Sequence, residues 1–341
     1  MNRTNILLTT IGRRTYLVRY FQKALNGNGN VYVTNSSSLV PAFEIADKAF
    51  LSPLTYDEGY VPFLKRICLE YNINAIVPVF DLELPILARH RKEFEDIGTK
   101  IVVSGENTVL TCNDKWLSFK FLDGAGIGTP RTFLDINAVK AAISNGEISY
   151  PIMIKPRWGM GTMSTYEACD EQELELLNKK VKREIFDSYL KYESSQDKEE
   201  CVIFQEKLSG QEYGLDIICD LNGIFRNTIV KKKYEMRANE TDCAITVRDE
   251  ALEDIGKCIA KSFGDMQGPM DVDVIRCGEK DYVLDLNARF GGGYPFSHIA
   301  GADVPQAIIN WLRGEAVEDN LITAQEGVAA RKEIGIVKIN I

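Results

Sequence analysis

Short apolar runs alternate with amphipathic stretches over the first 110 residues. Runs of strand length occupy residues 5–10, 31–33, 75–79 and 100–103, and helical spacing of apolar residues occupies 12–25, 61–71 and 84–94. Strands that alternate with helices indicate a parallel, doubly wound sheet. Such a sheet holds ligands at the carboxyl ends of its strands, where the sequence has Gly12, Asn35, Asp81 and Glu83. The fingerprint G-x-G-x-x-G is absent, so the pattern does not indicate a dinucleotide-binding domain.

The pattern changes near residue 110, where we place the first domain boundary. Beyond it the sequence predicts helices at residues 116–123, 251–263 and 307–312, and strands at 150–155, 201–206, 214–219, 224–233 and 334–339. The polar stretch 234–242 predicts a mobile loop between strands. We therefore expect three parts, at residues 1–110, 111–204 and 205–341.

Two segments near the C-terminal third alternate acidic or amide side chains with apolar ones. Asp271 and Asp273 alternate with valines, and Asp285 and Asn287 alternate with leucines. The turn at residues 277–280 predicts an antiparallel hairpin in which Asp273 faces Asp285. Opposed like charges destabilise a sheet, whereas a hard cation such as Mg²⁺ would bind these oxygen ligands. The hairpin alone leaves a cation site and a solvated acidic face equally open.

The composition is that of a soluble globular protein, since 45% of the 341 residues are hydrophobic and 26% are charged. The net charge of −9 argues against nucleic acid or an anionic membrane as the main partner. The apolar run near the start is too short for a signal core, and none is long enough to span a membrane. The 8 scattered cysteines and 2 histidines argue against a zinc site and favour reduced thiols in the cytoplasm.

Several charged positions keep two interpretations at this point. Lys155 precedes a glycine-containing loop at residues 157–165, which is either a phosphate lid or a plain hairpin turn, and the Walker pattern is absent. Asp81 and Glu83 are helix-cap residues or an amine site, with the cap favoured. Residues 231–233 are a solvated strand end or a carboxylate clamp, with the solvated end favoured.

Taken in order, these motifs resemble the ATP-grasp superfamily. The order is Asn113-Asp114-Lys115, Ile154-Lys155-Pro156 with its glycine loop, Gln205-Glu206-Lys207-Leu208, the lysine cluster, and Asp273 followed by Asp285-x-Asn287-x-Arg289. Within the superfamily the chain is similar to single-unit proteins that resemble half of the carbamoyl phosphate synthase large subunit. The resemblance implies mixed α/β and α+β architecture. An N-terminal Rossmann-like (pre-ATP-grasp) parallel sheet would be followed by a two-lobed ATP-grasp domain, with residues 111–204 as the small lobe and 205–341 as the large lobe.

The resemblance also implies a role for individual residues. ATP phosphates would contact Lys115 and Lys155, with the loop residues Gly159, Gly161 and Thr162 closing over them. Adenine would meet the backbone of Glu206 and Leu208, and ribose would meet Glu212. The metal ligands would be Asp273, Asp285 and Asn287, with Asp271 as a competitor for the first of these positions. Arg289 would lie beside the transferred phosphate and, with Lys155, act in catalysis.

The function implied is an ATP- and Mg²⁺-dependent ligase, with Mn²⁺ as an alternative ion. It would activate a carboxylate as an acyl phosphate for attack by an amine or another nucleophile. The alternatives are a carboxyphosphate-forming enzyme of the carbamoyl phosphate type and a nucleotide-binding subunit without turnover. Asp285 stands where the family more often has Glu, and a second ATP-grasp unit is missing. Partners would be small-molecule carboxylates and amines, with a homodimer as the candidate assembly. Substrate contacts are expected among Asp81, Glu83, Lys231, Lys233 and Arg248.

Overall fold

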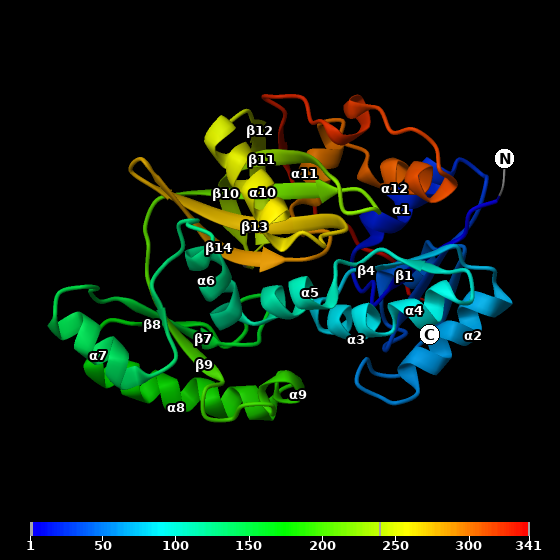
Figure 1. Cartoon of the computed structure of the whole chain (residues 1–341). Helices are drawn as coiled ribbons and strands as arrows, with labels where there is room; N and C mark the ends of the chain where they lie inside the picture. The colour runs from blue at the N-terminus through cyan, green and yellow to red at the C-terminus, as the bar shows by residue number, and fades with distance from the viewer. Residues whose placement is uncertain (1–2, 239, 340–341) are drawn as a thin grey trace.

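The computed structural model describes residues 3–238 and 240–339, and its first sheet is parallel, as the sequence predicts (Figure 1). The strand order is β3 (Lys48–Leu51), β2 (Val31–Asn35), β1 (Ile6–Thr9), β4 (Ala75–Pro78), β5 (Lys100–Ile101). Strand β3 was not predicted. Its burial is mixed and it forms an edge of the sheet, so it lacks the continuous apolar run of the central strands.

Helices cover both faces of this sheet. Ile6 and Leu8 pack with α1 (Thr15–Leu25) and α12 (Val304–Arg313), whereas Leu7 packs with α2 (Tyr60–Glu70). Period two along β1 therefore sends alternate side chains to opposite faces. The remaining short helices of this region are η1 (Pro41–Glu44), η2 (Asp81–Glu83), α3 (Leu84–Arg89) and α4 (Arg91–Glu95).

A four-stranded antiparallel sheet forms the small lobe, at the lower left of Figure 1. Its order is β6 (Thr132–Phe133), β9 (Val202–Glu206), β7 (Ile152–Pro156), β8 (Tyr166–Ala168). Its helices are α7 (Ile136–Ser144), α8 (Glu171–Asp187) and α9 (Lys191–Ser194). The Asp170 side chain accepts a hydrogen bond from the Glu173 N–H at 2.8 Å and so fixes the start of α8.

The large lobe is a second antiparallel sheet, of six strands. Its order is β14 (Lys280–Asn287), β13 (Gly268–Cys277), β10 (Gln211–Cys219), β11 (Phe225–Arg237), β12 (Glu240–Val247), β15 (Ala329–Arg331). The helices α5 (Glu106–Asn113) and α6 (Lys115–Gly124) precede the small lobe in sequence but contact β14. The helices α10 (Glu250–Phe263), α11 (Tyr294–Ile299) and η3 (Asp319–Ile322) lie in the same part of the chain as the strands of the large lobe.

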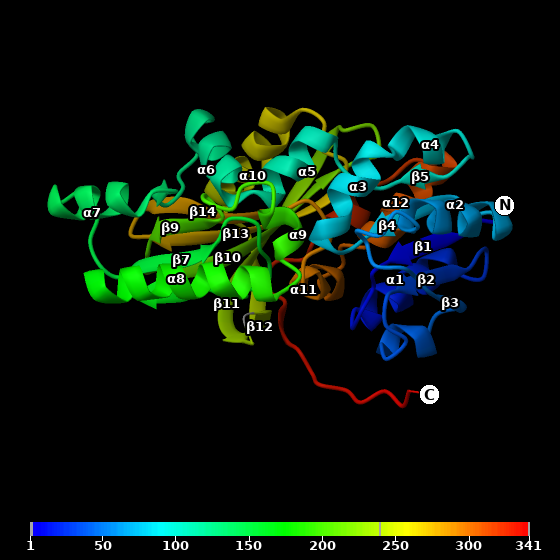
Figure 2. The same cartoon turned by 90° about the horizontal axis from the view of Figure 1, so that it is seen from below.

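Two predicted elements are wrong. Residues 234–242 were expected to form a loop, but β11 continues to Arg237 and β12 begins at Glu240, with Arg237 paired to Glu240 across the hairpin. An ion pair of 2.9 Å between Arg237 and Asp242 supports this polar extension, and residue 239 lies outside the described residues. Residues 334–339 were expected to form a strand, but the last strand, β15, ends at Arg331. The described residues after it form no strand and extend away from the sheets (Figure 2).

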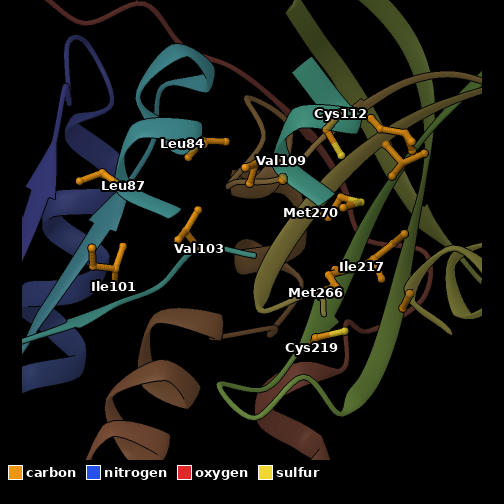
Figure 3. Close-up of a cluster of buried hydrophobic side chains, with 14 of the residues drawn as sticks. Leu84, Leu87, Ile101, Val103, Val109, Cys112, Ile217, Cys219, Met266 and Met270 are labelled. Atoms are coloured by element: carbon orange, nitrogen blue, oxygen red, sulfur yellow. The ribbon is translucent and has the colours of Figure 1, made fainter. Parts of the chain in front are cut away.

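One hydrophobic core joins the first sheet to the large lobe. Leu84 and Val103 from the N-terminal region belong to the same buried cluster as Val109 of α5 and Met270 of β13 (Figure 3). The helix α5 thus packs where the two sheets approach each other. The contact fixes the carboxyl edge of the parallel sheet beside the strand that carries Asp271 and Asp273.

Candidate active site

The acidic hairpin has the register that its sequence predicts. Asp273 pairs with Asp285 and Asp271 pairs with Asn287 on the antiparallel strands β13 and β14. A register shift after Asp273 absorbs the extra residue before the turn. Each member of the opposed pair also binds a lysine. Lys233 Nζ lies 2.5 Å from Asp273, and Lys115 Nζ lies 3.2 Å from Asp285, so the repulsion between the two carboxylates is compensated.

Lys231 and Lys233 of β11 are buried, so the interpretation of these two positions as a solvated strand end is wrong, whereas Lys232 between them is partly exposed. The side chains of Lys231 and Lys233 are 2% and 7% exposed. Lys231 Nζ lies 2.5 Å from Asp216, whose carboxylate also accepts a hydrogen bond from the Ser297 hydroxyl. A Cβ at Gly214 would lie at ordinary contact distance from both lysine side chains, 3.4 and 3.5 Å from their Cε atoms. Desolvated ammonium groups need such carboxylate partners.

A cavity of about 310 Å³ lies between the small lobe and β14. All the residues that the resemblance assigns to the nucleotide line it, and they come from the start of α6, β7, the glycine loop, β9, the connection after β9, and β10. They are Lys115, Lys155, Gly159, Gly161, Thr162, Glu206, Leu208 and Glu212. We call it the nucleotide cavity. Asp285 also lines it, so the acidic hairpin borders the same space.

Hydrogen bonds hold the two predicted phosphate lysines in the nucleotide cavity. Lys155 Nζ donates to Gln205 Oε1 at 2.8 Å, and Lys115 Nζ donates to the Gly159 carbonyl at 2.8 Å. Burial lowers the pKa of Lys155 to about 8, with a further contribution from the neighbouring Lys115 ammonium. Gln205 belongs to the motif Gln205-Glu206-Lys207-Leu208, but the sequence assigns it no role. Only the pairing of β7 with β9 places its amide beside Lys155.

The glycine loop between β7 and β8 is tied down at its start. The Asp114 side chain caps α6 and accepts hydrogen bonds from Arg157 Nε at 2.9 Å. Further along, Gly161 and Thr162 have φ of 60° and 56°, a left-handed conformation that is costly for threonine. Residues 160–163 line the nucleotide cavity and also a second cavity beyond it.

The second cavity, of about 450 Å³, lies between the first sheet and the large lobe, and we call it the acceptor cavity. Its charged lining comes from the loop before α1, η2, β11, β12 and the acidic hairpin. These residues are Arg13, Arg14, Asp81, Lys231, Lys233, Glu240, Asp271, Asp273, Asp285 and Arg289. Asn287 lines it as well. The two cavities therefore share Asp285 and the tip of the glycine loop.

Arg289 lines the acceptor cavity and contacts three side chains. Its guanidinium lies 2.9 Å from Asp81 and 3.3 Å from Asp271, and it donates to Asn287 Oδ1 at 3.1 Å. Burial raises the pKa of the Asp271 carboxyl to about 6, and Asp273 adds to the shift. The second candidate for the first metal position thus faces Arg289, whereas Asp273 faces Asp285.

Glu83 is the N-cap residue of α3, as the favoured interpretation allows, but neither its side chain nor that of Asp81 makes a capping hydrogen bond. Glu83 instead accepts hydrogen bonds from the hydroxyls of Tyr60 and Thr10 and from the Val79 N–H. Desolvation raises its pKa, and it lines neither cavity. Glu83 is therefore a buried structural carboxylate. Arg248 is exposed and also lines neither cavity, so of the five substrate candidates only Asp81, Lys231 and Lys233 reach the acceptor cavity.

The glycine run after Arg289 makes close approaches possible. A Cβ on Gly291 would lie 2.2 Å from the Asp271 carboxyl group, which no side chain tolerates. A Cβ on Gly292 would lie 3.6 Å from Glu240, and one on Gly293 would lie 3.6 Å from Lys231 Nζ. Gly292 and Gly293 line the acceptor cavity, so this run forms part of its wall as well as a turn.

Comparison with known proteins agrees with this geometry. Residues 112–293 match the family model described as ATP-grasp domain, which covers more than half of the chain. The chain belongs to the ATP-grasp family. Residues 6–102 of this ATP-grasp chain match a second family model, PylC-like, N-terminal domain. The resemblance inferred from the motifs is thereby confirmed, and so is the mixed α/β fold of a parallel sheet followed by antiparallel sheets.

Curated relatives of the ATP-grasp chain include two carbamoyl phosphate synthase large chains. The one from Pseudothermotoga lettingae is 22% identical over 299 residues, which are 85% of this chain and 25% of the relative. The one from Campylobacter jejuni is 19% identical over 276 residues, which are 78% of this chain and 23% of the relative. The chain thus spans about a quarter of the length of these relatives.

Solved structures share the fold at low identity. The biotin carboxylase domain of Hydrogenobacter thermophilus 2-oxoglutarate carboxylase, a dimer with MgADP and bicarbonate, is 18% identical at a TM-score of 0.72, over 95% of this chain and 72% of that one. L-Amino acid ligase from Bacillus licheniformis is 18% identical at a TM-score of 0.68, over 92% of this chain and 76% of that one. Every helix in the described part of the ATP-grasp chain is too short or too polar to cross a bilayer.

Proposed function

We propose that the chain is an ATP- and Mg²⁺-dependent ligase that activates a carboxylate as an acyl phosphate for attack by an amine or another nucleophile. The observation that carries this proposal is the meeting of the nucleotide and acceptor cavities at Asp285 and the glycine loop. A phosphate group bound by the loop would lie next to a carboxylate bound beside Arg289. Phosphoryl transfer needs such positioning and charge neutralisation, and it needs no nucleophile from the protein.

The nucleotide cavity supplies the contacts that ATP requires. Lys115 and Lys155 would bind its phosphates, and N–H groups of the loop at Gly159, Gly161 and Thr162 would add to them. The backbone of Glu206 and Leu208 would meet adenine, and Glu212 would bind ribose. Each of these residues lines the cavity, although Glu212 is also 3.7 Å from Lys233.

The acidic hairpin suits a divalent cation. Asp273, Asp285 and Asn287 offer oxygen ligands in the acceptor cavity, and the side chains of the two aspartates are 35% and 27% exposed. Oxygen donors of this kind fit Mg²⁺, with Mn²⁺ as an alternative. When bound, the ion would neutralise charge on the nucleotide phosphates. Lys115 and Lys233 form ion pairs with the two aspartates. When the cation binds these carboxylates, the two ammonium groups would become available to bind phosphate.

The three predicted parts of the chain would contribute different residues to these sites. Residues 1–110 would contribute Asp81 to the acceptor cavity, and residues 111–204 would carry the glycine loop. Residues 205–341 would carry the metal ligands and Arg289. Arg289 would bind the carboxylate and the phosphoryl group in transfer, because it is the cation that sits beside both Asn287 and Asp271. A homodimer is the proposed assembly.

The test is a screen of carboxylates with ATP, Mg²⁺ and hydroxylamine, in which ADP and hydroxamate are both measured. Hydroxylamine traps an acyl phosphate, so hydroxamate together with ADP from one class of carboxylate is the expected result. ADP formed with bicarbonate alone would support the carboxyphosphate alternative. The absence of ADP with every acceptor would contradict the ligase proposal and would favour a nucleotide-binding subunit without turnover.

A further inference from the structure

In the part of the chain that the structure describes, two arginines that line the acceptor cavity form no ion pair with a carboxylate. Among the described residues, the Arg13 side chain makes no hydrogen bond or ion pair. Arg14 Nη1 donates to the Phe290 carbonyl at 2.6 Å, which uses one donor of that guanidinium. A guanidinium carries five N–H donors. Most of the donors of this pair are therefore left for a ligand or water.

The two arginines lie at a helix end that does not favour cations. They stand directly before α1, where Arg14 is the N-cap and makes no capping hydrogen bond, and the first turn has no acidic residue. The helix macrodipole disfavours cations at this end and favours anions. An anion held by both guanidiniums would reverse the unfavourable charge and would meet the positive end of the helix.

Glu240, a carboxylate that also lines the cavity, does not serve as that anion. Glu240 is bound to Lys332 Nζ at 2.8 Å and forms no ion pair with Arg13 or Arg14. Burial opposes its ionisation, but the Lys332 ammonium, with Arg14 and Arg13, outweighs burial and lowers the pKa of Glu240. Glu240 is thus a charged carboxylate that is already paired. Its presence leaves the guanidinium pair open to another anion.

The anion is also distinct from the nucleotide. Arg13 and Arg14 do not line the nucleotide cavity, where Lys115 and Lys155 are the phosphate candidates. Arg14 is instead anchored to Phe290, the residue after Arg289, and the Tyr16 hydroxyl lies 3.5 Å from the Gly291 carbonyl. The loop before α1 is therefore fixed against the wall of the acceptor cavity, next to Arg289.

The charges that line the acceptor cavity favour a ligand with two negative charges. Five cations line it, namely Arg13, Arg14, Lys231, Lys233 and Arg289. Five carboxylates line it as well, and two of them, Asp273 and Asp285, belong to the proposed metal site. Ion pairs in the described part of the chain join Lys231 to Asp216, Lys233 to Asp273, Arg289 to Asp81 and Asp271, and Glu240 to Lys332. Arg13 and Arg14 are therefore the two lining cations without an ion pair among the described residues. A monoanionic acid would neutralise only one of them.

We propose that Arg13 and Arg14 bind a second oxyanion group of the acceptor, in addition to the carboxylate that is activated. The acceptor class is then a dicarboxylic acid or a carboxylic acid that bears a phosphate. Both groups offer the planar or tetrahedral oxygen edge that a guanidinium binds with two hydrogen bonds. This inference rests on the proposed function, because it takes the acceptor to occupy the cavity of Arg289.

Calorimetric titration tests binding without turnover. With ADP and Mg²⁺ at saturation, the wild type is titrated with succinate, glutarate and 3-phosphoglycerate, and with two matched probes that lack the second anion, monomethyl glutarate and glycerate. We expect at least one dianion to bind and its matched probe to bind about 10- to 100-fold more weakly, as for loss of charge-assisted hydrogen bonds. Arg13→Gln and Arg14→Gln should each remove this preference, and Arg13→Lys should retain part of it.

Arg19→Gln is the matched control, because Arg19 lies on α1, which directly follows Arg14, is exposed and lines neither cavity. This variant should bind the dianions as the wild type does. Equal binding of dianion and matched probe, or dianion binding that survives both Arg13→Gln and Arg14→Gln, would overturn the inference. Absence of binding by every acid in the panel would overturn it too. A preference for glutarate or for 3-phosphoglycerate tells which oxyanion the site accepts.

The hydroxamate assay separates this inference from the proposed function. Hydroxamate from a monocarboxylate, unchanged in Arg13→Gln, would support the ligase and overturn the second anion site. Dianion binding that depends on Arg13, with no ADP formed from any acid, would support the anion site and contradict the ligase. Hydroxamate from a dianion with KM raised about 10- to 100-fold in Arg13→Gln and kcat nearly unchanged would support both.

Discussion

Asp273 and Asp285 face each other across β13 and β14, and each carboxylate is bound to a lysine from a different part of the chain. Lys233 comes from β11 of the same six-stranded sheet, and Lys115 comes from the start of α6. The arrangement keeps two like charges together in the absence of a cation. It also lets both lysines neutralise charge in the same small volume that borders the two cavities.

Replacing Asp285 should remove catalysis and preserve the fold. Asp285→Ala deletes one of the two opposed carboxylates, so ATP turnover should fall by about 10²–10³ or more, the range found when one electrostatic contact of a transition state is lost. Far-UV circular dichroism and the Tm should stay close to the wild type, since relief of the Asp273 repulsion offsets the lost Lys115 contact. Wild-type turnover in Asp285→Ala would contradict the assignment of Asp285 as a metal ligand. Asp285→Glu, with the same charge, is the control and should keep measurable turnover.

The pKa of Lys155 predicts how nucleotide binding depends on pH. The neutral form gains population above about pH 8, because burial and Lys115 lower the pKa to about 8. Only the ammonium form attracts phosphate, so ADP affinity should be steady near pH 7 and fall as pH rises through 8. Calorimetry of ADP binding with Mg²⁺ measures this directly. Lys155→Arg stays charged over the whole range and should give a flat profile; a profile that falls equally in both proteins would assign the effect to another group.

The hairpin and the nucleotide residues were predictable because they depend on short-range patterns. Period two puts Asp273 and Asp285 on one face, and a short turn fixes which residues oppose, so the pair could be derived without a fold. The family motif then related Lys115, Lys155 and Glu206, which lie in separate elements but line one cavity. These predictions use only alternation, turn length and motif order.

The acceptor cavity was less predictable because its contacts join distant segments. The ion pair of Arg289 with Asp81 spans 208 positions, and the hydrogen bond of Arg14 to Phe290 spans 276. Burial of Lys231 depends on Asp216 in the neighbouring strand, which no local pattern relates to it. A run of three lysines is more often solvated, so the sequence favoured an exposed position for Lys231. The structure buries it because it pairs with the buried carboxylate of Asp216.

Gly291 should not accept even one methyl group. The Cβ of Gly291→Ala would lie 2.2 Å from the Asp271 carboxyl, so Asp271 would be displaced from Arg289. We expect destabilisation of about 1–3 kcal/mol, as for overpacking in a filled site, together with a loss of turnover. Urea unfolding and the ADP assay measure the two effects. Gly124→Ala is the control, since a Cβ there meets nothing within 4 Å and the residue ends α6. Wild-type stability and turnover in Gly291→Ala would contradict the close approach.

The Lys231–Asp216 pair provides a test of stability that is separate from catalysis. Lys231→Met leaves the buried Asp216 carboxylate with only the Ser297 hydroxyl, so unfolding free energy should fall by about 3–5 kcal/mol, as for a broken buried ion pair. Combining it with Asp216→Asn removes the unpaired charge and should recover a large part of that loss. Urea unfolding of the wild type, both single variants and the double variant gives the coupling energy. Lys232→Met, at the neighbouring position but only partly buried, should change stability by about 0.5 kcal/mol or less. Additive effects in the cycle would mean that the two groups do not stabilise each other.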